Sequence, residues 1–210
     1  MSGTESATHS PRLGTALSRQ AAVDAATRLY LAGEPVDMSA LATELGIGRS
    51  TLYRLVGNRE DLLSTVLAEA TERTFRRASA EVVAEAHERG EAPGGAEFAL
   101  AVMDRFLNAV VDAEPLQAVS QREPLLIVRL MLLPGLVEQT AGRMVSELLE
   151  AEIAAGRLEL PLPASTFGLA LIRMCDAHLY APLLGGGPPE IGTALDLVAA
   201  LLGHNRGSES

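Results

Sequence analysis

Lysine and tryptophan are both absent from this 210-residue chain, and aromatic residues make up only 3% of it. All 17 basic residues are therefore arginines. The hydrophobic core has to be built from aliphatic side chains, which suits packed helices. Cysteine is nearly absent as well, because Cys175 is the only one. An internal disulfide is excluded, and a reducing compartment is expected.

Targeting and catalytic motifs are missing too. The N-terminus lacks the basic-then-apolar layout of a signal peptide, and the apolar run 124–136 contains Arg129 and is too short to span a bilayer. We therefore expect a cytoplasmic protein without a membrane partner. The sequence has no nucleophile elbow, phosphate-binding loop or dinucleotide fingerprint. Cys175 and His178 alone do not form a zinc site, so we predict no enzyme, no metal and no cofactor.

Negative charge is abundant but unevenly distributed. The net charge of −10 argues against a protein that coats nucleic acid without specificity. Up to Glu60, six arginines balance six acidic residues, whereas eleven arginines face twenty-one acidic residues in the rest of the chain. A neutral N-terminal part on an acidic remainder fits a sequence-specific binder, because phosphate repels the acidic part.

Residues 38–56 carry a helix-turn-helix pattern. Apolar residues recur at helical spacing before and after Gly46, which stands where the first helix has to stop. Ala42 is small where the two helices cross. Without further features, the pattern also fits a structural helical hairpin. The side chains expected to face outward favour DNA binding, because all of them can bind phosphates or base edges: Arg49, Ser50, Tyr53 and Arg54.

Residues 46–62 resemble the N-terminal signature of the TetR family of bacterial one-component repressors. That signature has Thr-Leu-Tyr, a variable residue, His-Phe, a short turn and Lys-Glu-x-Leu. Here Leu55 and Val56 stand in place of His-Phe, and Arg59 replaces the lysine and keeps its charge. The match covers about residues 16–65. The variant Tyr-Arg-x-Val-Gly-x-Arg-Glu at 53–60 is similar to that of an actinobacterial subgroup of the family.

The resemblance implies a homodimeric repressor that binds pseudo-palindromic double-stranded operator DNA and is released by a small-molecule inducer. On the outward face, Arg49, Ser50 and Arg54 are expected to reach base edges. The motif match implies that Thr51, Tyr53 and Arg59 hold phosphates. An alternative is a small-molecule carrier or interaction module with a vestigial DNA-binding head. Salt-dependent operator binding separates the two hypotheses.

The predicted fold is all-α, with a three-helix head joined by a long helix to a larger helical body. The expected divisions are a disordered tail (1–15), the DNA-binding head (16–57), the ligand-binding and dimerisation body (58–204) and a short tail (205–210). The long helix is expected to run from about Arg59 to the region of Glu88. Further helices are expected at 96–113, 116–120, 124–133, 135–155, 163–179 and 188–203.

A ligand cavity in the body is predicted from its large adaptable side chains. Arg129 is the charge within the apolar run 125–133, where burial requires a partner. We weigh two roles for Arg129, an ion pair with Asp104 or Asp176 and a contact with the ligand's carbonyl or anionic group. The ligand is expected to be mostly apolar. The predicted site consists of Phe106, Arg129, Met131, Phe167 and Met174.

The last two expected helices are apolar over more of their surface than one buried face requires. An apolar surplus of this kind marks either an interface or helices buried within the monomer. In the family that the chain resembles, two such helices from each subunit form a four-helix dimer. The expected interface residues are Leu195, Val198, Leu201 and Leu202.

Overall fold

The computed structural model describes the backbone of residues 11–204 and the side chains of residues 19–204. Over this range the chain is all-helical and contains no strand, which confirms the predicted fold class. The helices are α1 (Pro11–Leu31), α2 (Met38–Glu44), α3 (Arg49–Val56), α4 (Arg59–Glu88), α5 (Gly95–Val111), α6 (Glu114–Arg122), α7 (Pro124–Ile127), the π-helical segment η1 (Val128–Leu132), α8 (Leu136–Ala154), α9 (Ala164–Leu179), the 3-10 segment η2 (Ala181–Leu184) and α10 (Ile191–Leu201).

Two element boundaries differ from the sequence-based expectation. Helix α1 begins at Pro11, inside the stretch 1–15 that was expected to be a disordered tail. Proline is compatible with the first position of a helix, because its missing N–H has no partner there in any case. The expected helix 124–133 is instead short α7 followed by η1, which ends before Pro134. Residues 1–10 and the tail 205–210 lie outside the described range.

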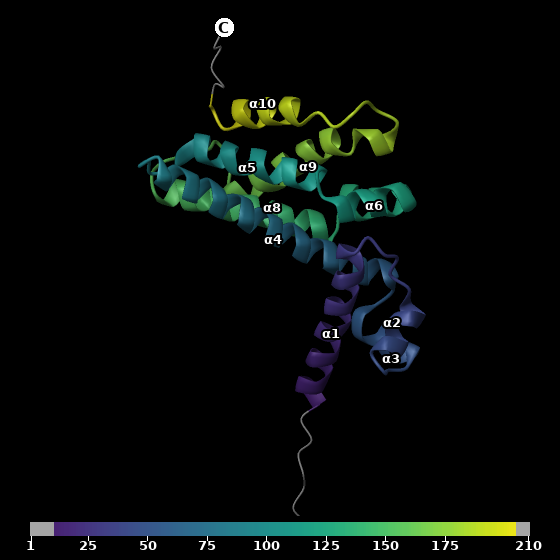
Figure 1. The fold of residues 1–210 in the computed structure, drawn as a ribbon. Coiled ribbons are helices and arrows are strands. Elements are labelled where there is room, and N and C mark those ends of the chain that lie inside the picture. Colours follow the sequence, from purple (N-terminus) through teal and green to yellow (C-terminus); the bar gives the residue numbers. More distant parts are fainter. Residues whose placement is uncertain (1–10, 205–210) are drawn as a thin grey trace, which may run out of the picture. The chain divides into compact units, whose positions relative to one another are not determined.

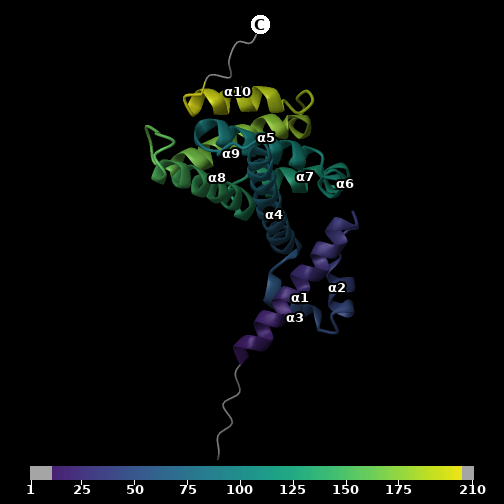
Figure 2. The same ribbon diagram turned by 60° about the vertical axis from the view of Figure 1, so that its left-hand side comes forward.

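The chain divides into two compact units, Met1–Val66 and Leu67–Ser210. The division falls within α4, whereas the boundary expected from the sequence precedes this helix. We call the described residues 11–66 the head and the described residues 67–204 the body. In the head, α1 packs against α3 and α2 (Figure 2). Its core is aliphatic and includes Ala22, Ala26, Leu41, Ala42, Leu52 and Leu62.

The body is organised around the pair α8 and α9, which lie side by side (Figure 1). Glycines bring the two helices together: a Cβ at Gly168 would lie 2.6 Å from the Gly142 carbonyl oxygen, and one at Gly142 would lie 3.3 Å from the Leu169 Cα. The Ser146 hydroxyl also donates to the Gly142 carbonyl, at 2.7 Å. The backbones therefore touch where ordinary side chains would separate them.

Helix α10 covers α5 and α9 (Figure 1). Helices α4 and α5 meet at an aromatic contact, with the Phe75 and Phe106 ring centroids 5.3 Å apart in an edge-to-face arrangement. Glu152, 3% exposed, joins α8 to the start of α5 by accepting from the Gly95 backbone N–H at 2.7 Å. Arg157 neutralises this buried carboxylate through two hydrogen bonds, of 2.7 and 2.8 Å.

No single helix in the described range is long and apolar enough to cross a membrane. The α7–η1 stretch and α8 reach the required length and composition only as a pair, which is bent by 44°.

Candidate DNA interface and effector cavity

Helix α3 has one buried face and one exposed face. Leu52 is fully buried and Val56 is 7% exposed, so both face the head core. Leu55 is half-buried. Positions 49 and 53, like positions 50 and 54, are four residues apart and share one side of the helix. The predicted outward residues are all exposed and lie next to one another: Arg49, Ser50, Tyr53 and Arg54.

The turn before α3 depends on Gly46. Its φ of +64° lies in the left-handed region, which glycine adopts without strain. This conformation lets the Gly46 N–H donate to the Thr43 carbonyl at 3.1 Å and the Ile47 N–H donate to the Ala42 carbonyl at 3.0 Å. The pair of bonds is a Schellman motif, which ends α2 and directs the chain into α3.

The end of α3 and the start of α4 are coupled through a reciprocal cap. The Asp61 N–H donates to the Asn58 side-chain oxygen at 3.0 Å, and the Asn58 N–H donates to the Asp61 carboxylate at 2.8 Å. Gly57 has a φ of +75°, and a Cβ there would collide with the Asp61 side chain. Asn58 and Asp61 therefore cap the start of α4 and fix the C-terminal end of the exposed face.

Arg59 has a structural contact as well as its predicted phosphate role. Its Nε–H donates to the Val36 carbonyl at 2.8 Å and joins the start of α4 to the loop before α2. Thr51 is half-buried. Both residues therefore lie at the edge of the exposed face of α3, and their contacts with DNA stay predictions.

The residue that caps the start of α2, Asp37, interacts with two of the head's arginines. The Asp37 carboxylate accepts the Ser39 and Ala40 backbone N–H groups, both at 2.8 Å, and so caps this helix. These bonds, from Ala40 first and then Ser39, hold the pKa of Asp37 below its ordinary value, and the charges of Arg49 and Arg59 lower it further. At neutral pH the Asp37 carboxylate that caps α2 is therefore negatively charged, close enough to Arg49 and Arg59 to interact with their charges.

Arg129, which was predicted as the polar end of an internal cavity, is not among the residues that line the cavities described below. Its side chain is exposed, because the apolar run does not form a single buried helix. The change from α7 to η1 alters the helical phase, and Leu125 and Leu133 at the two ends of the run are 76% and 52% exposed. The run therefore has one buried face, with Leu126, Ile127 and Met131, and one exposed face, which carries Arg129.

The other predicted ligand contacts are part of the body core. Phe106, Met131 and Phe167 are buried, and Met174 is half-buried. None of them lines the cavities described below. For these residues, the alternative that large apolar side chains serve packing fits the structure better than the predicted cavity wall.

Most of the expected dimer residues are also internal. Leu195, Val198 and Leu202 are 3%, 0% and 5% exposed, because α10 packs onto α5 and α9. For these three residues, burial within the monomer is the alternative that fits the structure better. Leu201 is 48% exposed, and Leu197, one turn earlier, is 40% exposed. The outer face of α10 is therefore apolar at these two positions, one of which the sequence analysis missed.

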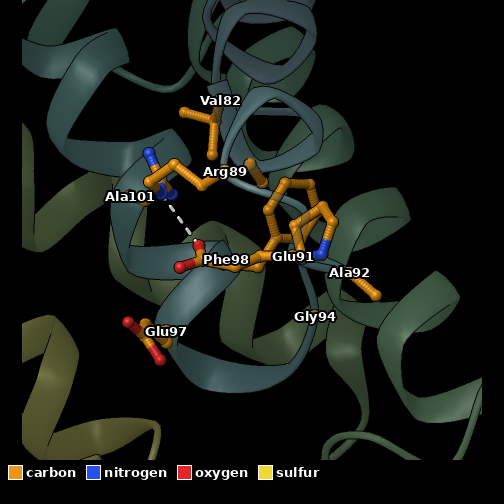
Figure 3. A pocket seen from close by; sticks show the side chains of 10 residues that line it. Val82, Arg89, Glu91, Ala92, Gly94, Glu97, Phe98 and Ala101 are labelled. Atoms are coloured by element: carbon orange, nitrogen blue, oxygen red, sulfur yellow. Dashed lines mark hydrogen bonds and ion pairs between the residues drawn. The ribbon is translucent and has the colours of Figure 1, made fainter. Parts of the chain in front are cut away.

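The described body contains several cavities, of which three are described here by their lining residues. One, of about 330 Å³, lies between the end of α4 and the start of α5 (Figure 3). Its wall includes Phe98 and an ion pair of 2.9 Å between Arg89 and Glu91. A second, of about 360 Å³, lies between α4 and α8 and includes Arg76 and Glu147. Both are lined by charged side chains.

The third cavity, which we call the α6 cavity, also has a volume of about 360 Å³. It lies between the C-terminal end of α5, helix α6 and the segment from the end of α9 through η2 to Pro189. No charged side chain lines it. Its wall consists of Val110, Val111, Leu116, Gln117, Ser120, Gln121, Leu179, Tyr180, Pro182, Leu183 and Pro189.

The sequence analysis missed the polar wall of this cavity. Gln117, Ser120 and Gln121 are spaced i, i+3, i+4 and share one face of α6. That spacing is visible in the sequence. It resembles any solvated helix face, however, and only the packing of α6 against distant parts of the chain distinguishes it.

A second group missed by the sequence analysis lies on α8 and α9. Glu138, 6% exposed, accepts from the Arg173 Nε–H at 2.6 Å. Asp176 is half-buried close by, and burial, with a smaller effect from Glu138, raises its pKa to about 7. Burial also raises the pKa of the Cys175 thiol to about 12, so this cysteine is not a reactive thiolate. His178 contacts Glu190 at 3.2 Å.

A helix-turn-helix head with exposed arginines and a helical body with an uncharged cavity together define a class, that of ligand-responsive DNA-binding regulators. A family model described as the C-terminal domain of tetracyclin repressor-like proteins matches residues 94–203. None of the curated proteins matches the chain.

Two solved structures extend the comparison over most of the chain. The transcriptional repressor QsdR of R. erythropolis, from the TetR family, is 45% identical and has a TM-score of 0.86, covering 93% of this chain and 100% of its own. The TetR family repressor AlkX of Dietzia sp. strain DQ12-45-1b, implicated in biodegradation of n-alkanes, is 20% identical and has a TM-score of 0.60. That match covers 88% of this chain and 93% of AlkX, and it shows the fold alone.

The chain belongs to the TetR family of transcriptional repressors. It is accordingly a ligand-responsive repressor and not an enzyme, as the residues at 46–62 had indicated. Repressors of this family bind operator DNA and small ligands.

Proposed function

We propose that two copies of this chain bind one pseudo-palindromic operator, each placing the exposed face of α3 in the major groove. The observation that carries this proposal is the contiguous exposure of Arg49, Ser50, Tyr53 and Arg54 over a buried Leu52. The N-terminal residues of a recognition helix contact base edges in this arrangement. Because the partner is operator DNA, the protein acts in the cytoplasm.

Within this face, roles follow from side-chain chemistry. Arg49 and Arg54 carry planar guanidinium groups that suit bidentate contact with guanine, and the Ser50 hydroxyl can bond either donors or acceptors on base edges. Tyr53 and Thr51 each supply a hydroxyl for phosphate oxygens, which sets the register but does not read sequence.

The test is a fluorescence anisotropy titration on operator and non-operator duplexes. Arg54→Ala should weaken operator binding by about 1–3 kcal/mol and relax the sequence preference. Arg77→Ala, which removes an exposed arginine from the body segment of α4, is the matched control and should change neither. If Arg54→Ala leaves both affinity and preference at the wild-type values, α3 is not the reading element.

Tyr53→Phe separates positioning from reading. The substitution keeps the ring and removes only the hydroxyl, so binding to all duplexes should weaken by a similar factor. An effect confined to the operator would assign Tyr53 to base readout instead. If the wild-type protein shows no salt-dependent binding to any duplex, the carrier hypothesis is favoured over the repressor hypothesis.

We propose further that the two copies associate through the outer face of α10 together with α9. Leu197 and Leu201 are one turn apart, 40% and 48% exposed, and form an apolar stripe beside the solvent-exposed Ala200. Two copies of such a stripe related by a twofold axis are self-complementary, as isologous dimers require. Leu195 and Val198 support the stripe from beneath.

The dimer is tested by sedimentation of a double variant, Leu197→Glu with Leu201→Glu. It should sediment as a folded monomer and lose operator affinity, because the two half-sites no longer bind as a unit. Leu125→Glu, at a leucine that is 76% exposed on α7, controls for adding negative charge to the body. A double variant that remains dimeric would place the interface on another surface.

A further inference from the structure

The α6 cavity differs from the two charged cavities described above in having no charged side chain in its wall. Its volume of about 360 Å³ falls within the range of small-molecule sites, which are mostly apolar with a few placed polar groups. The apolar part comes from the end of α5 and from the α9–η2 segment. Leu116 and Leu179, both buried, form its floor.

Most polar side chains of the cavity come from α6, and Tyr180 adds a hydroxyl from the end of α9. Gln117 donates through Nε2 to the Val111 carbonyl at 2.7 Å, which joins α6 to the end of α5 across the cavity. Within the part of the chain that the structure describes, the side chains of Ser120 and Gln121 have no hydrogen-bond partner. They supply a hydroxyl and an amide, both able to donate to a ligand oxygen.

We infer that the α6 cavity is the effector site of this repressor and that it takes an uncharged amphipathic ligand. An aliphatic chain of such a ligand lies against Val110, Leu179 and Leu183. A neutral carbonyl or ester group accepts hydrogen bonds from Ser120 and Gln121. This inference rests on the proposed ligand-released repression and names the place and the chemical class of the ligand.

Electrostatics excludes the charged alternatives. An ionic head group that enters the cavity loses hydration, and the wall supplies no opposite charge to replace it. A carboxylate or an ammonium ion is therefore penalised relative to an ester with the same chain. In the cavity of Figure 3, by contrast, Arg89 and Glu91 offer charges of both signs.

The site is coupled to the packing of the body through Gln117. A ligand between α5 and α6 contacts both helices that the bond from Gln117 to Val111 joins. If the ligand binds more tightly to a conformation with a wider spacing of α5 and α6, binding shifts the population of the body toward that conformation. That difference in affinity is what a ligand-released repressor requires.

Three probes with the same chain length test the inference: methyl octanoate, octanoate and octylamine. Titration calorimetry on the full chain without DNA should show saturable binding of the ester and at least about tenfold weaker binding of the two ions. Because this readout needs no operator, it is independent of the proposed DNA recognition. Failure of the protein to bind any operator would remove the repressor proposal and leave the calorimetric result standing.

Two variants locate the binding. Leu183→Trp fills the cavity and should abolish ester binding, whereas Ala101→Trp, the matched control in the cavity of Figure 3, should bind like the wild type. Gln121→Arg changes only an exposed rim residue, so it should fold normally, and it should strengthen octanoate binding by about tenfold.

Each outcome of these binding experiments either supports or overturns the inference. Ester binding that Leu183→Trp removes and Ala101→Trp keeps, with octanoate gained in Gln121→Arg, supports the site. No ester binding to the wild-type protein, ester binding that Leu183→Trp leaves unchanged, or equal binding of all three probes would overturn the inference. If Leu183→Trp does not fold, Gln121→Arg alone decides, because an unchanged octanoate affinity there excludes the cavity.

Discussion

The head and the body of this repressor are built on different principles. In the head, local hydrogen bonds determine where each helix begins and ends: Asp37 caps α2, Gly46 ends it, and Asn58 with Asp61 starts α4. In the body, contacts between distant residues hold the helices together, such as Glu152 with Gly95 and Gly142 with Gly168. The head therefore presents a fixed surface, and the body can change its packing with a ligand.

The sharpest test of this comparison is the α8–α9 contact. Gly168→Ala places a Cβ 2.6 Å from the Gly142 carbonyl oxygen and against the Ser146 hydroxyl, so the two helices have to separate. We expect a loss of about 3 kcal/mol in unfolding free energy. Denaturant titration of the body's helical signal measures it.

The control for this variant is Gly192→Ala in α10. A Cβ at Gly192 meets nothing within 4 Å, so alanine should stabilise slightly, by about 0.5 kcal/mol, through helix propensity. Equal effects of the two substitutions would show that the close approach of α8 and α9 is not what holds the body together.

The second test concerns pH and also belongs to the body. The pKa of Asp176 is raised from 3.8 to about 7, so the folded state keeps a proton that the unfolded state loses above about pH 4. Stability therefore falls as the pH rises from about 4 to about 7. Asp176→Asn removes the ionisation and should be more stable than the wild type at pH 8 by about 2 kcal/mol.

The measurement is thermal or urea unfolding of both proteins at pH 5 and pH 8. Asp176→Asn should show a smaller loss of stability between the two than the wild type. Asp104→Asn, at an exposed aspartate on α5, is the control and should follow the wild-type pH profile. Parallel profiles for the wild type and Asp176→Asn would mean that Asp176 is ionised in the folded protein at pH 5.

These tests also explain what the sequence could predict. The helix-turn-helix pattern is predictable because its signals are local: Gly46, the capping residues and the outward arginines all lie within about twenty residues of one another. Most helix positions in the body were predictable for the same reason. The sites in the body were not, because whether Arg129 or Leu195 is buried depends on packing between distant helices.

Arg129 illustrates the limit most clearly. The argument that a charge in an apolar run needs a partner assumes that the run is buried. In the structure, α7 gives way to a π-helical segment, and only one face of the run is buried, whereas Leu125 and Arg129 are exposed. The polar face of α6 shows the opposite error, because the sequence gives no sign that it lines a cavity. It becomes a cavity wall only where α6 packs near η2, and it consists of Gln117, Ser120 and Gln121.

A third test returns to the head. Asn58→Ala removes the side-chain oxygen that accepts the Asp61 N–H and should destabilise the start of α4 by about 1 kcal/mol. Asn58→Ser retains an oxygen at the cap and should restore most of the loss. Chemical denaturation followed in the head, for example by hydrogen exchange of α3 amides, measures the effect. Full stability in Asn58→Ala would show that the body, and not local capping, determines where α4 begins.

The smallest expected effect separates two roles of Arg59. Lysine keeps the positive charge but lacks the Nε–H that donates to the Val36 carbonyl at 2.8 Å. If Arg59 mainly supports the head, Arg59→Lys should lower stability by about 0.5–1 kcal/mol and leave the salt dependence of operator binding unchanged. If Arg59 mainly holds a phosphate, Arg59→Met should reduce the salt slope by about one contact, and Arg59→Lys should not.

Arg28→Lys, at an exposed arginine paired with Glu44 at 2.6 Å, is the control, because an exposed ion pair contributes little to stability. A normal salt slope in Arg59→Met together with the stability loss in Arg59→Lys would assign Arg59 to the head's structure and remove it from the DNA contacts.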